Sequence, residues 1–567
     1  MNLLNPAPLR TFCRTQRSWN PGRCWPFLAL AVSILAGVFA LAGDTIPSPA
    51  SPISKSWPLS LTNFLAAALA QNERIQAQLV SFEATNRSAR AERGIFEPNL
   101  VASADRVDNS RQNSSQQIVS LGTQLFAEQN NLYNGALEQL VPTGARVRLG
   151  YNLQDLRNTL QLNRFTKGEY ISFVGVNLVQ PLLKNAGSGA TLTGIRVADL
   201  NTEIAWQEYR RAMFQILGGA ESAYWGLFLA QEQLRALEES VKVAEGVLED
   251  FKARAAAGNA SNLDVLQAKA DLSTRRLARG DAAQRLVDAR ARATGFIATT
   301  DSDPRGILTA ETPPEMPPPD LASNDHLHWM ITLNPEYVAQ RKRIEQEGVR
   351  VSYARNQRLP QLDLKASYGL NGLGETPARS WDQASGGNYP SWYLGVELRI
   401  PLLGDIRSRN ELAAAKARKK SALLGLKDLE TQLANALSTT LQRIRHDHEA
   451  IGDTETTVRL NQSLLETEMA RLDVGRTSAR HIMEVERDLL IAKINALGTV
   501  VRYNQSVIDL QVLEGTYLSK RSLEYSPYLV AARIRALITG EPRNSNLGHK
   551  WQNTPITPAS ATVLGEP

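Results

Sequence analysis

The distribution of proline constrains this chain more than any other feature of its sequence. No proline occurs between Pro181 and Pro304, or between Pro401 and Pro527, and both stretches are rich in Ala, Leu, Glu, Arg and Gln. A proline inside a helix costs roughly 3 kcal/mol, and those five residue types are good helix formers. The sequence therefore predicts two helical regions far longer than the average globular helix of about 11 to 12 residues.

Each long region contains one glycine-centred break, where a helical hairpin is predicted to turn. The first break is Ala257-Gly258-Asn259 and the second is Val474-Gly475-Arg476. Glycine readily adopts the left-handed conformation that commonly ends a helix. At a rise of 1.5 Å per residue, the segment that leads to each turn can approach about 100 Å. Such a helix must bury its apolar stripe against another long helix. Apolar residues recur at coiled-coil-like spacing at Leu227, Leu234, Leu237, Val241 and Leu248.

Two shorter segments ahead of the second long region alternate between apolar and polar residues, as a β-strand does. They run from Leu362 to Leu370 and from Trp392 to Ile400. Each is about nine residues, close to a tilted membrane-spanning strand, and their Tyr and Trp residues suit an aromatic girdle. A soluble sheet with one wet face uses the same alternation, so both interpretations stay open here. No hydrophobic stretch after residue 42 has the length of a membrane helix, so a membrane role would require strands.

An internal repeat relates the two halves of the chain. The segment Gly175–Leu183 matches Gly395–Leu403, and Gly258–Leu272 matches Gly475–Leu489. Such self-similarity indicates a duplicated structural unit. Each unit is predicted to contain a helix, a strand, a loop, a strand and a long helical hairpin. The predicted strand-to-helix junctions are Pro98, Pro181, Pro360 and Pro401.

The first unit is longer than the second because of one polar insertion. The extra residues fall in the Ser/Gln/Asn-rich stretch from Asp105 to Gln129. Stretches of that length without regular structure are usually functional or flexible loops. We therefore expect a long loop between the two strands of the first unit.

The first residues have the features of a secretory signal peptide. Four arginines without acidic residues precede an apolar run that ends in Ala40-Leu41-Ala42, so cleavage is expected near Ala42. We expect residues 1–42 to be the signal peptide, 43–58 an N-terminal segment and 59–300 the first repeat. Residues 301–325 are expected to form a stiff Pro-rich linker, 326–520 the second repeat and 521–567 a partly disordered tail.

Charge and motif content argue against several classes of function. The net charge of +6 includes the four signal-peptide arginines, and removing them leaves about +2, so no nucleic-acid partner is indicated. Both cysteines, Cys13 and Cys24, precede the expected cleavage site, so the mature chain would hold no thiol. No phosphate loop, paired-cysteine motif or nucleophile elbow is present, so neither an enzyme activity nor a cofactor is predicted.

Two His-x-His pairs were the candidate metal ligands. They are His326 with His328, and His446 with His448. Positions two apart on a helix point in different directions, and no cysteine joins either pair. No metal site is therefore predicted.

This ordered combination of motifs resembles the TolC family of outer membrane factors, over roughly residues 59 to 520. The motifs that carry the resemblance are Gln180-Pro181-Leu182-Leu183, Ile400-Pro401-Leu402-Leu403, Leu333-Asn334-Pro335-Glu336 and the tip from Gly258 to Leu266. The resemblance implies an α+β membrane protein and a homotrimer. Each protomer would give four strands to a shared twelve-stranded β-barrel in the cell outer membrane, and two helical hairpins to a long periplasmic α-helical barrel. Three copies would close sheet edges that lipid does not tolerate.

The function implied is that of a passive exit duct, with no chemistry of its own. A tripartite efflux system and a type I secretion system both remain open, and each would pair the trimer with a periplasmic adaptor protein and an inner-membrane pump. The alternative from another class is an exported coiled-coil scaffold that is not inserted in the membrane. That scaffold would fractionate as a soluble periplasmic protein.

The resemblance also assigns roles to the hairpin tips. From the residues alone, Ser261 and Asp264 have the spacing of a capping box, which is a purely structural explanation. The resemblance adds adaptor docking at Gly258, Asn259, Asp264, Gly475 and Arg476.

The second tip is expected to form the periplasmic entrance, at His481 and Glu484. These residues are three apart, so both can project from one helix face. Glu484 would favour cations, and histidine is the side chain that titrates closest to neutral pH. His481 replaces the aspartate usual at this position of the family, and a solvated capping substitute is the alternative explanation of it.

Overall fold

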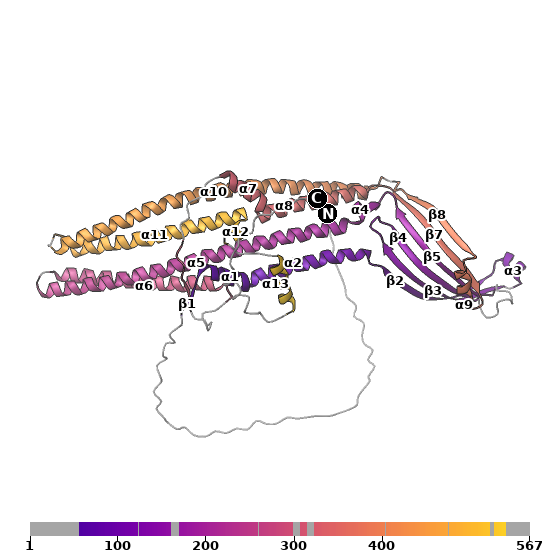
Figure 1. The fold of residues 1–567 in the computed structure, drawn as a ribbon, viewed down its shortest axis with the longest axis horizontal. Coiled ribbons are helices and arrows are strands. Elements are labelled where there is room, and N and C mark those ends of the chain that lie inside the picture. Colours follow the sequence, from indigo (N-terminus) through magenta and orange to yellow (C-terminus); the bar gives the residue numbers. More distant parts are fainter. Residues whose placement is uncertain are drawn as a thin grey trace, which may run out of the picture. The chain divides into compact units, whose positions relative to one another are not determined.

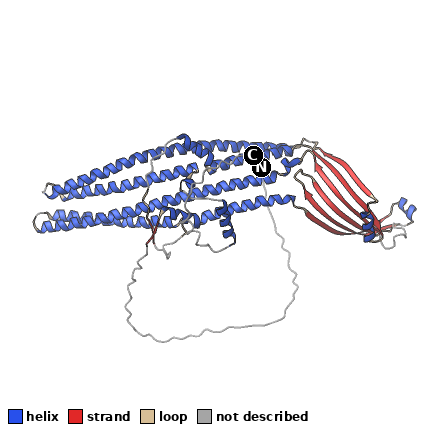
Figure 2. Cartoon of the chain, viewed as in Figure 1, coloured by secondary structure: helices blue, strands red, loops and turns tan. Residues whose placement is uncertain are grey.

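The computed structural model describes residues 56–122, 124–159, 169–258, 260–298, 307–314, 323–402, 404–473, 476–521 and 527–539. The expected signal peptide and cleavage site lie outside these ranges. All elements below belong to one unit, Lys55–Pro567. Long helices and a single large sheet make up most of it (Figure 2). Within the described ranges, no helix combines the length and apolar character needed to cross a bilayer.

Two long helical hairpins confirm the interpretation of the proline-free regions. The first pairs α5 (Thr193–Ala256) with α6 (Asn262–Thr294), and the second pairs α10 (Ile406–Asp473) with α11 (Ala479–Glu514). Helices α5 and α10 contain 64 and 68 residues. They are therefore about 96 and 102 Å long.

The second helices of the hairpins, α6 and α11, are only about half as long as α5 and α10. Two further helices therefore pack on the half of α5 and α10 that α6 and α11 do not reach. Helix α2 (Glu73–Ala91) packs on α5, and α8 (Pro335–Asn356) packs on both α10 and α5. Each begins at an asparagine cap. Asn72 accepts hydrogen bonds from two N–H groups of α2 and donates to Phe296, and Asn334 does the same for α8 and donates to Leu513. The caps thus join the start of each short helix to the end of a returning helix.

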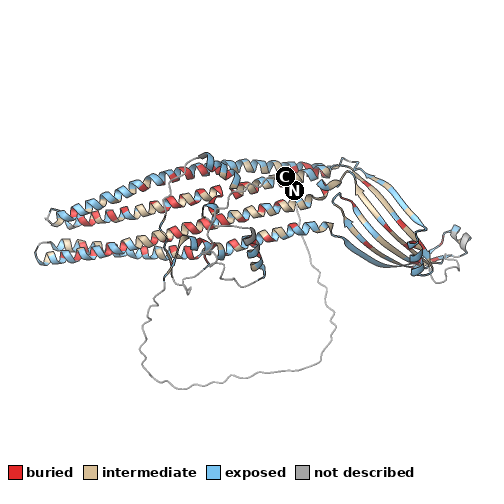
Figure 3. Ribbon diagram, in the orientation of Figure 1, coloured by how far each residue is buried: buried red, intermediate tan, exposed pale blue. Residues whose placement is uncertain are grey.

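The main core lies where these helices meet. Phe64, Met213, Leu217, Tyr224 and Ile508 are almost fully buried there and come from α1 (Leu61–Gln71), α5 and α11. Buried positions follow the helix seams, whereas the outer strands of the sheet are largely exposed (Figure 3). The remaining helices are η1 (Glu92–Phe96), α3 (Ser115–Leu121), α4 (Gly187–Thr191), α7 (Ser323–Leu333), α9 (Pro377–Ser385), α12 (Tyr517–Lys520) and α13 (Pro527–Thr539).

Two parts of the expected linker and tail have regular structure. Strand β1 (Ser56–Leu59) pairs in parallel with β6 (Ile307–Ala310), which lies inside the expected linker. Helix α13 lies inside the expected tail, and the Arg533 guanidinium donates a hydrogen bond to the Leu69 carbonyl of α1. Residues 522–526 and 540–567 of the expected tail lie outside the described residues.

The large sheet has six antiparallel strands in the order β2-β3-β4-β5-β7-β8. The six strands lie side by side, and the long helices leave from one end of them (Figure 1). The strands expected near 362–370 and 392–400 are confirmed as β7 and β8. The bounds are β2 (Asn99–Gln112), β3 (Leu125–Leu140), β4 (Arg146–Leu156), β5 (Glu169–Pro181), β7 (Gln361–Gly374) and β8 (Pro390–Arg399).

The expectation of four strands in each protomer is wrong for this chain. The stretch from Asp105 to Gln129, expected to be a loop, is about half strand: β2 continues to Gln112 and β3 begins at Leu125. A further hairpin, β3–β4, stands between β2 and β5. The physical reason is that backbone pairing of β2 with β3 forms this part of the sheet, and exposed strand positions accept polar side chains.

Candidate functional site: hairpin tips and sheet face

The first hairpin turns at a glycine and restarts on a capping box. Gly258 has a φ of +79°, which favours glycine. The Asp264 N–H donates to the Ser261 hydroxyl oxygen at 3.2 Å, and the Ser261 N–H donates to the Asp264 carboxylate at 2.9 Å. These bonds from Ser261 lower the pKa of Asp264. The capping-box prediction is confirmed, whereas Asn259 lies outside the described residues.

The second tip has only half of that cap. The His481 N–H donates to the Ser478 hydroxyl oxygen at 3.4 Å, and the imidazole stands where the first tip has a carboxylate. The neighbouring Arg476 is exposed, and its N–H donates to the Arg471 carbonyl at 2.9 Å. Gly475 lies outside the described residues. The side chain of His481 does not take part in the cap and lies among charged side chains instead.

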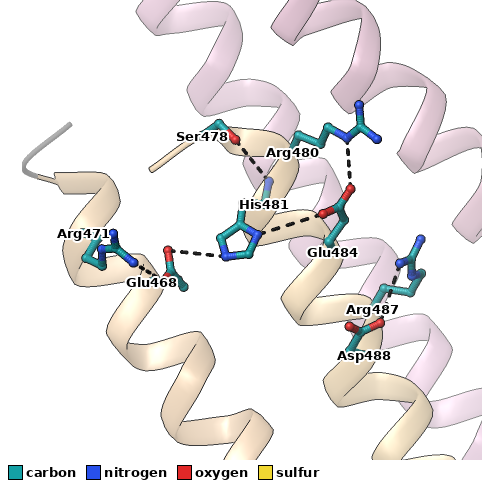
Figure 4. A network of polar contacts seen from close by, with 8 residues as sticks. All are labelled: Glu468, Arg471, Ser478, Arg480, His481, Glu484, Arg487 and Asp488. Carbon is teal, nitrogen blue, oxygen red and sulfur yellow. Dashed lines mark hydrogen bonds and ion pairs between the residues drawn. The ribbon is translucent and has the colours of Figure 1, made fainter. Parts of the chain in front are cut away.

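His481 lies between two carboxylates (Figure 4). Its Nε2 is 3.8 Å from Glu468 of α10, and its Nδ1 is 4.0 Å from Glu484. Glu468 is almost fully buried and accepts from Arg471 at 2.7 Å, while Glu484 accepts from Arg480 at 3.0 Å. A hydrogen bond from Thr477 and then the Arg471 pair lower the pKa of Glu468. The Arg480 hydrogen bond lowers the pKa of Glu484.

This network revises the simple expectation for the entrance. His481 and Glu484 do share one helix face, but Arg480 compensates the Glu484 charge, and Arg487 lies one turn further on beside Asp488 at 3.6 Å. Arg480 was detectable in the sequence from its spacing of four to Glu484. Glu468 was not detectable, because it belongs to the opposite helix of the hairpin.

A buried ion pair joins the two hairpins near their tips. Arg275 of α6 contacts Glu486 of α11 at 2.8 Å and Asp271 at 2.7 Å, and its side chain is only 7% exposed. Arg275 also donates to the Ser240 hydroxyl of α5 at 2.5 Å. Burial raises the pKa of Glu486, although Arg275 opposes that shift. Met483 packs into the first hairpin beside this pair. The second tip is therefore fastened to the first by both polar and apolar contacts.

The four predicted junction prolines all lie at strand ends. Pro98 directly precedes β2, Pro181 ends β5, Pro360 precedes β7 and Pro401 follows β8. The Leu182 N–H donates to the Leu362 carbonyl at 2.7 Å, which extends the sheet pairing to the start of the helical region.

One face of the sheet carries an apolar band that crosses all six of its strands. Cross-strand register places Leu364 opposite Val396 and Ala366 opposite Leu394, so these apolar residues share a face. Large exposed apolar side chains on it are Leu100, Tyr133, Leu137, Leu149, Val176, Tyr368, Trp392, Leu394, Val396 and Leu398. A patch of this extent indicates a membrane or protein contact. Helix α9 covers one end of the face, where Trp381 meets Tyr151 edge-on at 5.2 Å.

The His-x-His pairs do not converge. His326 is buried with its Nδ1 2.5 Å from a Glu514 oxygen, while His328 is exposed. His448 lies against the Tyr503 ring, 5.7 Å between centroids. In the part of the chain that the structure describes, no three His, Cys, Asp or Glu side chains are grouped as metal ligands.

Comparisons with known sequences show where the chain belongs. The profile of a family described as "outer membrane efflux protein" matches residues 64–295 and 330–516. Among curated proteins, the chain is 26% identical to Protein CyaE of Bordetella pertussis over 270 residues, which are 46% of this chain and 55% of that protein. The chain thus spans about half the length of this curated relative.

Three solved structures share the fold. The Campylobacter jejuni CmeC outer membrane channel has a TM-score of 0.58 and 14% identity, with coverage of 84% of this chain and 89% of that one. A membrane protein from Pseudomonas aeruginosa has a TM-score of 0.59 and 17% identity, and the match covers 83% of this chain and 99% of that one. The open state of the Neisseria gonorrhoeae MtrE outer membrane channel has a TM-score of 0.56 and 16% identity, and the match covers 82% of this chain and 91% of that one.

Proposed function

Because the chain belongs to the outer membrane efflux protein family, we propose that three copies form the exit duct of a tripartite efflux or type I secretion system. It is located in the outer membrane, with a helical extension into the periplasm. The observation that carries the proposal is the apolar sheet face joined directly to hairpins of about 100 Å. The strands would contact lipid while the hairpins form the tunnel.

The two ends of the sheet support assembly from several copies. Among the described residues, β2 and β8 each have a partner strand on one side only, and every residue of β2 is exposed. Open strand edges are not stable in lipid, where every backbone polar group needs a partner within the protein. Strand β2 runs away from α2 and β8 runs toward α10, so β2 of one copy can pair antiparallel with β8 of the next. Three copies would close the wall.

The hairpin tips are the proposed contact for partner proteins. They lie at the ends of the hairpins remote from the sheet (Figure 1). In this proposal a periplasmic adaptor docks at Gly258, Asn259, Asp264, Gly475 and Arg476, and an inner-membrane pump supplies the energy. Crosslinking from positions 258 and 475, followed by identification of the captured adaptor and pump, tests this assignment.

Membrane fractionation separates the duct from the exported scaffold. A duct should be extracted from outer membranes only by detergent, and should migrate as a trimer that heating converts to monomer. Release of the protein with the soluble periplasmic fraction would instead identify a coiled-coil scaffold. Planar-bilayer conductance of the purified trimer completes the test, because a scaffold forms no pore.

The charge network of the second tip predicts ion selectivity that depends on pH. Lowering the pH from 7.5 to 5.5 should reduce cation selectivity, because histidine gains charge in this range. The lowered pKa values of Glu468 and Glu484 keep both carboxylates charged across it. Glu484→Gln should also reduce cation selectivity at pH 7.5, because it leaves Arg480 without its ion pair. Reversal potentials in single-channel recordings measure both effects.

The matched control is Glu466→Gln, which removes an exposed carboxylate two residues from Glu468 and therefore on another face of α10. It should leave selectivity unchanged. A pH response that persists in His481→Asn, or selectivity unaffected by Glu484→Gln, contradicts the assignment of the entrance to this network.

A further inference from the structure

Hairpin β3–β4 is the part of the sheet that the expected four strands do not include. It lies within the sheet, between β2 and β5, and not at an edge. Strand β3 pairs with β2 from Asn99↔Glu138 to Gln112↔Leu125, and β4 pairs with β5 from Arg146↔Val179 to Leu156↔Glu169. Because β2 and β5 do not pair with each other, removing the hairpin would divide the sheet in two.

The apolar face continues through this hairpin without interruption. Leu100 of β2 lies opposite Leu137, which lies opposite Leu149, which lies opposite Val176 of β5. The exposed fractions of Leu137, Leu149 and Val176 are 44%, 51% and 41%. The hairpin therefore presents apolar area much as its neighbour β5 does. A hairpin outside the wall would have no reason to keep this register, since a shift of one residue moves every side chain to the other face.

The opposite face of the hairpin carries polar side chains, as the same face of the β7–β8 pair does. Glu138 of β3 forms an ion pair with Arg148 of β4 at 3.4 Å, and Asn134 lies opposite Asn152. The β7–β8 pair places its Lys365–Glu397 ion pair on this same face. Membrane barrels alternate apolar residues toward lipid with polar residues toward the lumen. The hairpin therefore has the same polarity as the β7–β8 pair.

The turn of the hairpin is fastened at the level where strands give way to helices. The Gly187 N–H donates to the Thr143 carbonyl at 2.9 Å, and the Thr143 hydroxyl donates to Gln180 at 3.1 Å. Gly144 has a φ of +90°, and a Cβ there would lie 2.6 Å from the Asn185 carbonyl oxygen. These contacts hold the turn beside the end of β5, so β3 ends and β4 begins where the neighbouring β5 ends.

We propose that hairpin β3–β4 is part of the lipid-facing wall, with Leu137 and Leu149 in contact with lipid hydrocarbon. Six strands from each of three copies then close a wall of 18 strands, in place of the twelve expected from the family resemblance. This inference rests on the proposed function. Barrel diameter grows roughly linearly with strand number, so the mouth is about 1.5 times as wide as that of a twelve-stranded barrel.

Site-directed spin labelling of the full-length protein in lipid vesicles tests the position of the hairpin. Both native cysteines precede the expected cleavage site, so introduced cysteines can be labelled singly. Labels at Leu149→Cys and Leu137→Cys should collide readily with oxygen, which is enriched in lipid, and poorly with a water-soluble nickel chelate. Asn152→Cys, on the polar face, should show the reverse preference. Val396→Cys on β8 is the matched control, because its lipid contact does not depend on the hairpin.

Two outcomes separate this inference from the proposed function. Lipid accessibility at Val396 with water accessibility at both Leu137 and Leu149 overturns the inference and leaves the duct intact. Water accessibility at Val396 as well removes the proposed function. Electron cryomicroscopy of the unlabelled trimer gives an independent answer that does not depend on how the variants fold. A count of 18 strands supports the proposal, and a count of twelve overturns it.

Discussion

Replacing Arg521 by alanine is expected to lower the free energy of unfolding by about 3 to 5 kcal/mol, because it leaves a buried carboxylate without its partner. That carboxylate belongs to Glu221 of α5, whose side chain is 0% exposed. Arg521 donates to both of its oxygens, at 2.5 and 3.0 Å, and the Tyr517 hydroxyl donates to one at 2.6 Å. Burial and the adjacent carboxylate raise the pKa of Tyr517, so it stays a neutral donor. Denaturant unfolding of the detergent-solubilised protein, at one fixed protein concentration, measures the loss.

The control is an ion pair of the same kind on the surface. Arg443 lies 3.5 Å from Asp509, with both side chains about half exposed, and Arg443→Ala should cost about 0 to 1 kcal/mol. A second variant isolates the charge: adding Glu221→Gln to Arg521→Ala should recover part of the loss, because a neutral amide needs no counter-charge. Equal losses in Arg521→Ala and Arg443→Ala would show that the buried carboxylate is compensated in another way.

Val396→Arg is expected to cost about 2 to 4 kcal/mol of membrane insertion, because it places a charge on the lipid face near the bilayer centre. Val396 is 65% exposed and lies opposite Leu364 within the β7–β8 pair. Val396→Leu keeps the apolar character and should be tolerated. The yield of trimer in outer membranes, and folding into lipid vesicles, measure the difference between the two variants.

Ser367→Arg provides the matched control on the polar face. Ser367 lies on β7 between Asn177 and Tyr393 in register, so an arginine there points away from lipid. It should assemble at close to the normal yield. Normal trimer yield from Val396→Arg would mean that this face of the sheet does not meet the bilayer.

The long helices, their turns and two strands were predictable because their causes are local. The absence of proline over the long regions predicts helix, and a glycine with a positive φ ends the first of them at Gly258. The capping box of Ser261 and Asp264 joins residues only three apart. The apolar alternation from Leu362 to Leu370 likewise needs only neighbouring positions to be recognised.

Hairpin β3–β4 shows where local pattern was present but was interpreted incorrectly. Val147, Leu149, Tyr151 and Leu153 alternate with polar residues, as a strand does. The polar stretch ahead of them has the composition of a loop, because polar residues occupy both faces of β2 beyond Ala104. A polar residue on a wet sheet face and one in a loop are alike in sequence. Only the pairing of β3 with β2 distinguishes them, through the register.

What the sequence by itself determined is therefore the set of long helices, the hairpin turns, strands β7 and β8 and the caps, since each depends on residues within a few positions of one another. The tertiary structure decided the number of strands and the partners of the charges. His481 meets Glu468 across a hairpin, Arg275 meets Glu486 across two hairpins, and Arg521 meets Glu221 from 300 residues away. Such pairs form because tertiary packing brings distant segments of the backbone side by side. The spacing of the two residues along the chain does not indicate that they will be in contact.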